Sequence, residues 1–151
     1  NLSVQGTKNF QIDHPLEKGK DLVHAAMEGP EAAVMYRGEA QLSGGQCEVV
    51  LPKYFEALVR PEDRSVLLTP LVNNATGAAK GTSALATSAI VGGKFTVYAL
   101  DDRNPSQAFY WEAKGVRSDV ERLVVEPSKR HKPVGPAPQP AKPMKVSVKH
   151  Q

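Results

Sequence analysis

The sequence predicts an all-β protein, either an antiparallel β-sandwich or a small barrel, with one short helix. Three observations support this fold class. Roughly eight short segments alternate apolar and polar residues, the pattern of strands with one buried face. Two Gly-Gly pairs separate such segments, and glycine supplies the positive φ angles of tight hairpin turns. A single short segment has the apolar spacing of a helix, so strands dominate the expected architecture.

The first strands are expected near the N-terminus. Residues 1–6 alternate and end in glycine, as a short edge strand does. Residues 8–12 alternate again and place Phe10 and Ile12 on one face. Residues 22–27 are a compact apolar run that suits a buried strand.

A hairpin and a helix are expected next. Residues 33–42 predict a long strand whose even-numbered positions share one face. Ser43-Gly44-Gly45 predicts a tight turn into a strand at 46–51, so the two strands should form a hairpin. In the second strand, Cys47 is expected to be a small half-buried residue rather than a nucleophile. Residues 52–58 predict a helix of at most two turns, with Pro52 in its first turn.

The second half of the chain predicts strands at 65–71, 85–91, 94–100, 107–116 and 123–126. Gly92-Gly93 should join two of them as a second hairpin. Phe109, Trp111 and Ala113 should face the core, while Tyr110 faces the opposite side. Residues 73–83 form the longest internal loop, for which a contact surface and a plain connection are both open interpretations.

Composition limits the function classes. A chain of 151 residues with 40% apolar residues can bury one core. No apolar run approaches the roughly 20 residues of a membrane-spanning helix, so no membrane insertion is expected. The net charge of +3 is unevenly divided: residues 128–151 carry six cations and no acid, which leaves thirteen cations against sixteen acids before them. Such a mildly acidic body is not expected to bind nucleic acid.

The C-terminal segment 127–151 is basic and rich in proline. Its proline spacing predicts an extended polyproline II conformation rather than sheet or helix. Near its end, Val146 and Val148 alternate with polar residues and could add as an edge strand to the sheet of another chain.

Four segments carry a resemblance: KNF-x-IDHPL at 8–16, LVHAA-x-EGPE at 22–31, YRGEA at 36–40 and YFEAL at 54–58. Together they resemble the C-terminal module of phage tail-fibre-like proteins, which also occurs in prophage and bacterial β-helical fibre-like proteins. The resemblance covers residues 7–126 and implies that 1–6 are the end of a shaft, with 127–151 as a tail. In similar proteins a W-x-V-x-G-x-R-x-D pattern ends the module; here Ala113 stands in place of the commoner valine.

The resemblance implies a structural virion protein and no catalysis. The chain would be the homotrimeric terminal module of a tail fibre, active in host attachment and fibre trimerisation, with the chain start continuing from a longer protein. Its partners would be two further copies, other virion tail or fibre proteins and a host surface polysaccharide. The expected trimer contacts are Phe10, Ile12, Leu16 and Tyr36. The alternative is a carbohydrate-binding, receptor-recognition module of a secreted or cell-surface bacterial protein of prophage origin.

Candidate sites follow from exposed aromatic residues, the long loop and the histidines. Aromatic rings stack on sugars and enrich interfaces, so the candidate receptor or glycan contacts are Asn73, Asn74, Tyr98 and Tyr110. His14 and His24 match no metal-ligand spacing, and structural roles are favoured; in a trimer, one histidine per chain could still meet a metal on the threefold axis. No Gly-x-Ser-x-Gly or Ser-x-x-Lys motif is present, so neither catalytic residues nor a cofactor are expected.

Overall fold

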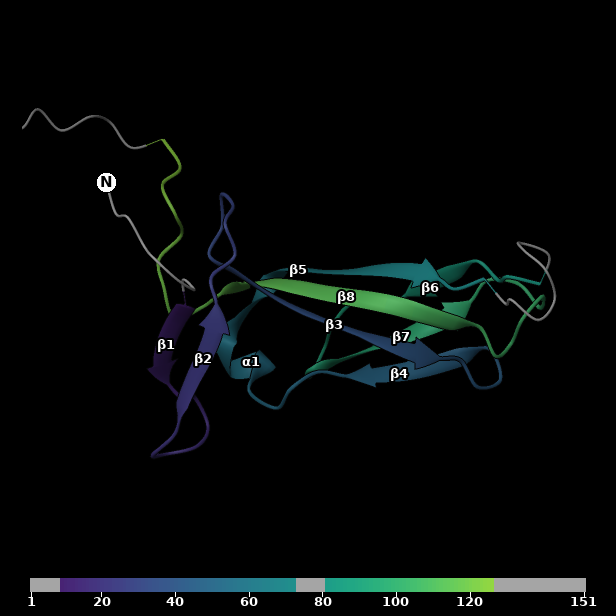
Figure 1. Ribbon diagram of the computed structural model, residues 1–151, viewed down its shortest axis with the longest axis horizontal. Helices are drawn as coiled ribbons and strands as arrows, with labels where there is room; N and C mark the ends of the chain where they lie inside the picture. Colours follow the sequence, from purple (N-terminus) through teal and green to yellow (C-terminus); the bar gives the residue numbers. More distant parts are fainter. Residues whose placement is uncertain (1–8, 73–80, 127–151) are drawn as a thin grey trace, which may run out of the picture.

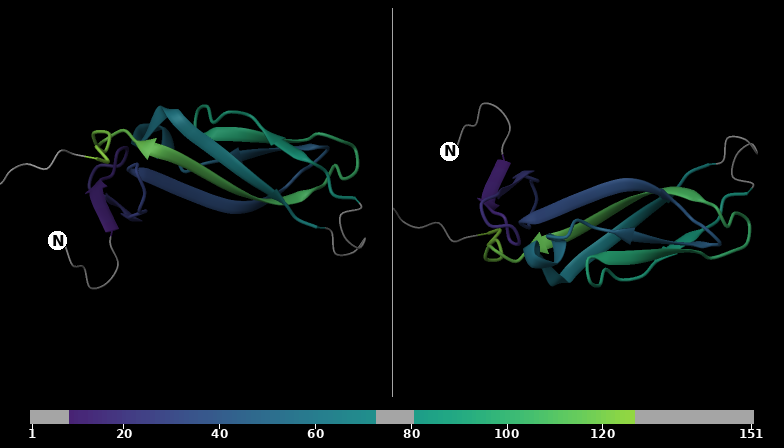
Figure 2. Two further views of the ribbon diagram at one scale, coloured as in Figure 1. Left: turned by 90° about the horizontal axis from the view of Figure 1, so that it is seen from above. Right: turned by 90° about the horizontal axis from the view of Figure 1, so that it is seen from below.

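The computed structural model describes residues 9–72 and 81–126, which form an all-β structure with one short helix. Two three-stranded antiparallel sheets and a separate two-stranded hairpin make up this part of the chain (Figure 1). Figure 2 shows the two larger sheets as layers and the hairpin at one end. The expectation of an antiparallel all-β fold with a brief helix is therefore confirmed.

The first sheet has the strand order β3-β8-β5. It consists of β3 (Ala33–Gln41), β8 (Ala108–Arg117) and β5 (Val59–Pro70). The central strand β8 pairs with β3 along its length, from Ala33 opposite Val116 to Gln41 opposite Ala108. The central strand β8 carries Tyr110.

The second sheet has the order β4-β7-β6. It consists of β4 (Gln46–Val50), β7 (Lys94–Ala99) and β6 (Leu85–Thr87). Alternation in β7 is as expected, because Phe95 and Val97 are buried while Tyr98 is exposed. Cys47 lies in β4 and is half-buried, as its surroundings predict.

The core lies between the two sheets. Phe109 and Ala113 of β8 are fully buried, as are Phe95 and Val97 of β7. Because successive residues of a strand point to opposite faces, each sheet supplies only every second side chain to this core. Burial of large apolar side chains is the main term that stabilises such a fold, and here a single chain buries them by itself.

The turn at Gly44-Gly45 does not make a hairpin. Both glycines have positive φ, and residues 43 and 46 form the expected turn contact. However, β3 and β4 belong to different sheets, so the expected first hairpin is wrong. The turn instead carries the chain from one sheet to the other. Gly45 N–H donates a hydrogen bond to the carbonyl of Pro105.

The turn at Gly92-Gly93 does make the expected hairpin, because β6 pairs with β7. The strand β6 is shorter than expected and ends at Thr87. Beyond it, Ser88 N–H bonds the Thr96 carbonyl, and Val91 pairs with Lys94. Between these two contacts, the segment that follows β6 has two residues where β7 has one. This is the arrangement of a β-bulge.

The helix α1 (Phe55–Leu58) is a single turn that buries Phe55 and Leu58 in the core. It begins three residues later than the expected 52–58 and ends where expected, because the chain is already extended at Val59. The strand β5 consequently begins earlier than the expected 65–71. Its first part is irregular, with a register shift after Val59 and a positive φ of 63° at Asp63.

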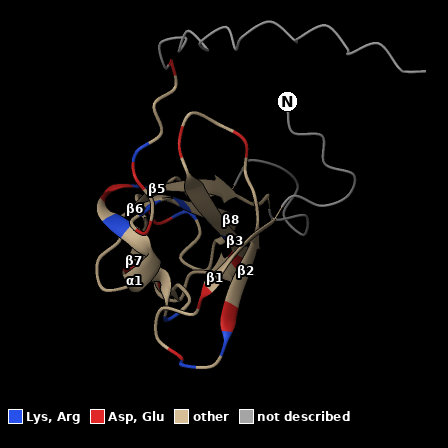
Figure 3. Ribbon diagram, turned by 90° about the vertical axis from the view of Figure 1, so that its left-hand side faces the viewer, with Lys and Arg blue, Asp and Glu red and all other residues tan. Residues whose placement is uncertain are grey.

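The hairpin at one end is built from β1 (Asn9–Asp13) and β2 (Asp21–Ala25), which pair antiparallel (Figure 3). Both strands lie close to their expected positions. The strand expected at 123–126 is wrong: these residues pair with no strand in the described chain and run away from the sandwich. The expectations for 1–6, for the loop at 73–80 and for 127–151 lie outside the described residues.

Candidate functional site

An aromatic stack joins the β1–β2 hairpin to the sandwich. The rings of Phe10 and His24 are stacked, with centroids 5.2 Å apart and planes 11° apart. The Arg117 guanidinium carbon lies 3.7 Å from the centroid of the same Phe10 ring. Arg117 is buried and its charge is balanced by Asp119, at 2.9 Å between Nε and Oδ1. A cation over an aromatic face is attractive, and more so when water is excluded.

The surroundings of His24 favour its neutral form. Its Nε2 lies 3.2 Å from the Tyr36 hydroxyl, and its ring meets those of Tyr36 and Tyr54 edge-on. Burial lowers the pKa of His24 and the positive charge of Arg117 lowers it further. Burial likewise raises the pKa of the Tyr36 hydroxyl. Among the described residues, His24 Nδ1 is a buried nitrogen with no hydrogen-bond partner.

His14 has a local structural role. Its Nδ1 accepts hydrogen bonds from the backbone N–H groups of Leu16, at 3.2 Å, and Glu17, at 2.9 Å. Its ring meets Tyr54 edge-on at 5.5 Å between centroids. Within the described residues of one chain, no three His, Cys, Asp or Glu side chains gather so as to hold a metal. An axial metal shared by three chains stays a prediction.

The four expected trimer contacts differ in exposure. Phe10, Ile12 and Tyr36 are partly buried against the core of their own chain. Leu16 is 56% exposed in the turn between β1 and β2. The structure therefore gives the first three residues a role inside one chain, and Leu16 is the member of the set that a neighbour can reach most easily.

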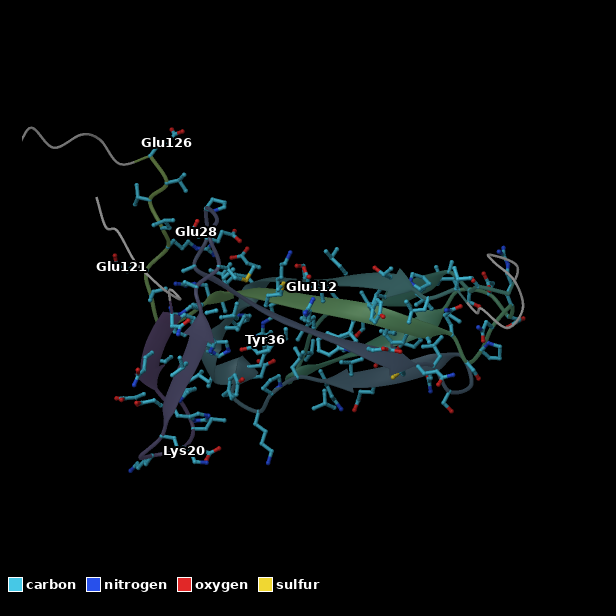
Figure 4. The ribbon with its side chains drawn as sticks, in the orientation of Figure 1. Lys20, Glu28, Tyr36, Glu112, Glu121 and Glu126 are labelled. Atoms are coloured by element: carbon cyan, nitrogen blue, oxygen red, sulfur yellow. The ribbon has the colours of Figure 1, made fainter. Side chains whose placement is uncertain are left out.

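The outer face of the β3-β8-β5 sheet carries an open groove of about 620 Å³. Its walls are the outward side chains of three strands: Arg37, Glu39, Leu67, Thr69, Tyr110 and Glu112. The strand register arranges these six as two rows (Figure 4 labels Glu112). One row runs Arg37, Glu112, Leu67, and the other runs Glu39, Tyr110, Thr69.

This groove combines an aromatic ring, an aliphatic side chain and charges of both signs. Tyr110 is 51% exposed and Leu67 is 60% exposed. Glu112 is ion-paired with Lys114 at 2.7 Å. On such a surface, the flat apolar face of a ligand can stack on the Tyr110 ring. The neighbouring polar side chains then offer hydrogen-bond donors and acceptors to the same ligand.

Tyr98 and Tyr110 do not share a surface. Tyr110 lies on the outer face of the β3-β8-β5 sheet, whereas Tyr98 lies on the outer face of the β4-β7-β6 sheet, opposite Gln46. The sequence alternation predicts that both are exposed, and this is confirmed. The alternation could not show that Arg37 and Glu39 lie beside Tyr110. That contact depends on the pairing of two strands about 70 residues apart in the chain.

A buried polar cluster anchors the loop at the far end of the sandwich. The Gln107 side chain is buried; its Nε2 donates to the Leu71 carbonyl at 2.6 Å and its Oε1 accepts from Ser83 N–H at 3.0 Å. Ser83 Oγ donates in turn to Asp101 at 2.8 Å. Both ends of the 72–82 loop are thereby fixed to one side chain. The candidate contacts Asn73 and Asn74 lie outside the described residues, as do Val146 and Val148.

Comparison with known protein families, with curated proteins and with solved structures finds no match for this chain. Within the described residues, no helix is long and apolar enough to cross a membrane.

Proposed function

We propose that this chain is the terminal attachment module of a trimeric fibre-like protein and that it acts by binding rather than by catalysis. The segments that resemble phage tail-fibre-like proteins support the proposal, because they meet in one place. Phe10, His24, Tyr36 and Tyr54 come from the four resembling segments and form one connected set of ring contacts. The shared residues thus join a hairpin to a sandwich, which is a structural task.

The observation that carries the proposal is the outer face of the β3-β8-β5 sheet. An antiparallel sheet with one solvated face normally presents polar side chains there. Here Met35, Leu67 and Tyr110 are exposed on that face beside Arg37 and Glu39. Aromatic residues, methionine and arginine are the residue types enriched at protein interfaces, so this face suits contact with a neighbouring subunit.

A second candidate function is recognition of a glycan in the same groove. The observation that favours it is the position of Tyr110 between Glu39 and Thr69 in one row of the sheet. An exposed ring can stack on the apolar face of a sugar, while the carboxylate and hydroxyl on either side can bond its hydroxyl groups.

The oligomeric state of a Leu67→Lys variant tests the first proposal. We expect a trimer for the unchanged chain and monomers for the variant, because a charge would enter the subunit contact. The matched control is Val50→Lys, since Val50 is 70% exposed on the outer face of β4. Sedimentation equilibrium measures the mass, and far-ultraviolet circular dichroism checks that both variants fold.

Three outcomes separate the functions. A trimer that survives Val50→Lys and dissociates with Leu67→Lys supports the assembly role. A monomeric unchanged chain contradicts it. Glycan-array binding that Tyr110→Ala abolishes, while the mass stays the same, assigns the groove to the second candidate.

A further inference from the structure

A second groove, of about 540 Å³, lies at the end of the molecule that carries the β1–β2 hairpin. One wall is the loop between β2 and β3, which contributes Met27 and Glu31, and the other is the stretch 118–126 that follows β8, which contributes Glu121 and Leu123. Phe10 also lines this groove. Figure 4 shows Glu121 and Glu28 close to the point where the stretch after β8 leaves the sandwich.

The charged groups of this groove are predominantly acidic. Glu28, Glu31 and Glu121 line it, and Arg117 is its one cation. The Arg117 charge is already balanced by Asp119, and the nearby Arg122 is bonded to Asp63 at 2.5 Å. In the described part of the chain, neither Glu31 nor Glu121 forms a salt bridge, although the charge of Arg122 acts on Glu31 from a distance. The groove therefore offers negative charge to a partner.

Apolar contacts are available beside these carboxylates. Met27 is 40% exposed and Leu123 is 57% exposed. A groove with an apolar lining and a charged rim suits an extended peptide whose apolar residues pack inside and whose cations reach the rim. A compact anion or a nucleic acid is disfavoured by the sign of the charge.

The chain itself supplies a segment of the matching chemistry. Residues 127–151 contain the cations Lys129, Arg130, Lys132, Lys142, Lys145 and Lys149, no acid and six prolines. The described chain ends at Glu126, three residues after Leu123, which lines the groove. An extended chain spans at most about 3.5 Å per residue, so Lys129 and Lys132 can reach the groove of their own chain.

We propose that the basic C-terminal segment 127–151 docks in this groove of its own chain, with its lysines and arginine bonded to Glu31 and Glu121. Charge complementarity and the short tether carry the proposal. A tether of this length holds the segment at a millimolar effective concentration, so docking within the chain is favoured over docking in a second copy. The contact would be weakened by salt, because both carboxylates are exposed and so are screened.

Zero-length carbodiimide cross-linking of the full chain tests this proposal, since it joins a lysine to a carboxylate only when the two are in contact. We expect mass spectrometry to find the lysines of 127–151 joined mainly to Glu31 and Glu121. The variant Glu31→Gln/Glu121→Gln should lose these products by tenfold or more. The matched control, Glu39→Gln/Glu112→Gln in the other groove, should keep them.

Mixing ¹⁴N-labelled and ¹⁵N-labelled chains identifies the donor of each lysine. Products within a single isotope support docking in the same chain, and mixed-isotope products as the main species overturn it in favour of a second copy. Cross-links spread evenly over exposed carboxylates such as Glu39 and Glu48 overturn the site itself, as does their survival in the Glu31→Gln/Glu121→Gln variant. The four glutamates substituted in the variant and in its control lie at the surface. These substitutions therefore leave the core intact.

Discussion

At the scale of single residues, Gly115 sets how closely the helix end packs on the central strand β8. A Cβ atom at this position would lie 2.2 Å from Val59 Cγ1 and 3.7 Å from Phe55 Cζ. Non-bonded carbon atoms do not approach each other to 2.2 Å. A side chain at this position therefore requires Val59 to move, and Val59 is itself buried. Backbone conformation is not the reason for this glycine, since its φ is not positive.

We expect Gly115→Ala to lower the free energy of unfolding by about 1–3 kcal/mol, the usual cost of overpacking a core. Urea denaturation followed by Trp111 fluorescence measures the change. Gly29→Ala is the matched control, because no atom lies within 4 Å of the added Cβ, and it should change stability by less than about 0.5 kcal/mol. If Val59→Ala fails to relieve part of the loss in a double-mutant cycle, the clash with Val59 is not the cause.

The residue scale also shows what alternation can and cannot predict. Alternation correctly places Gly38 and Trp111 on the inner faces of their strands. It does not show that the two touch, although a Cβ at Gly38 would lie 2.7 Å from Trp111 Cζ2. That contact follows from the register of β3 against β8, in which Gly38 lies opposite Trp111. Register between distant segments is a property of the folded chain and is not encoded in either segment alone.

At the scale of elements, the one-turn helix α1 is held by a charged contact. Arg64 makes two bonds to Glu56, at 2.7 and 3.0 Å, and Glu56 Oε1 also accepts the Gly93 N–H at 2.6 Å. The Arg64 guanidinium is buried and lies over the Phe55 ring. This contact ties α1 to β5 and to the β6–β7 turn, which a single helical turn needs because short helices are unstable alone.

We expect Glu56→Gln to cost about 1 kcal/mol of stability at pH 7. Hydrogen bonds to charged groups contribute about 1.5–3 kcal/mol, and the 41% exposure of the Glu56 side chain reduces this. The bond from Arg64 lowers the pKa of Glu56 below its ordinary value of 4.5. The contribution is therefore complete above pH 4.5 and is lost as the pH falls through the lower, folded-state pKa.

Denaturant-induced unfolding at pH 7 and at pH 3 measures this contribution. The difference in free energy of unfolding between Glu56→Gln and the unchanged chain should shrink on acidification. The control is Glu48→Gln, whose partner Lys94 is 53% exposed, so its effect should be near zero at both values. An equal loss for both variants would show that the buried arginine does not depend on Glu56.

The two Gly-Gly turns show the limit of prediction at this scale. Local chemistry predicts both turns correctly, because each needs positive φ at two positions. The second turn makes a hairpin and the first does not, since β3 pairs with β8 and β4 pairs with β7. A tight turn serves equally to reverse a chain within a sheet or to pass it between two sheets. The groove beside Tyr110 could not be predicted for the same reason. Its other walls come from β3 and β5, and local sequence does not show which strands pair.

At the scale of the whole molecule, the described chain divides into a six-stranded sandwich and a two-stranded hairpin. Among the described residues, no backbone strand pairing joins the hairpin to either large sheet. Its attachment depends on side chains, chiefly the stack of Arg117, Phe10 and His24. An isolated two-stranded hairpin is marginally stable in water, so this stack decides whether the hairpin stays folded.

We therefore expect the hairpin to open at a lower free energy than the sandwich. In native-state hydrogen exchange, the amides of the paired residues Ile12 and Leu22 should exchange by local opening, while those of Phe109 and Ala113 exchange only on global unfolding. Phe10→Ala should accelerate exchange in the hairpin by tenfold or more and leave the two β8 amides nearly unchanged. Val50→Ala, on the exposed outer face of β4, is the control and should alter neither set. Equal opening free energies for hairpin and sandwich in the unchanged chain would mean that the aromatic stack joins them into one cooperative unit.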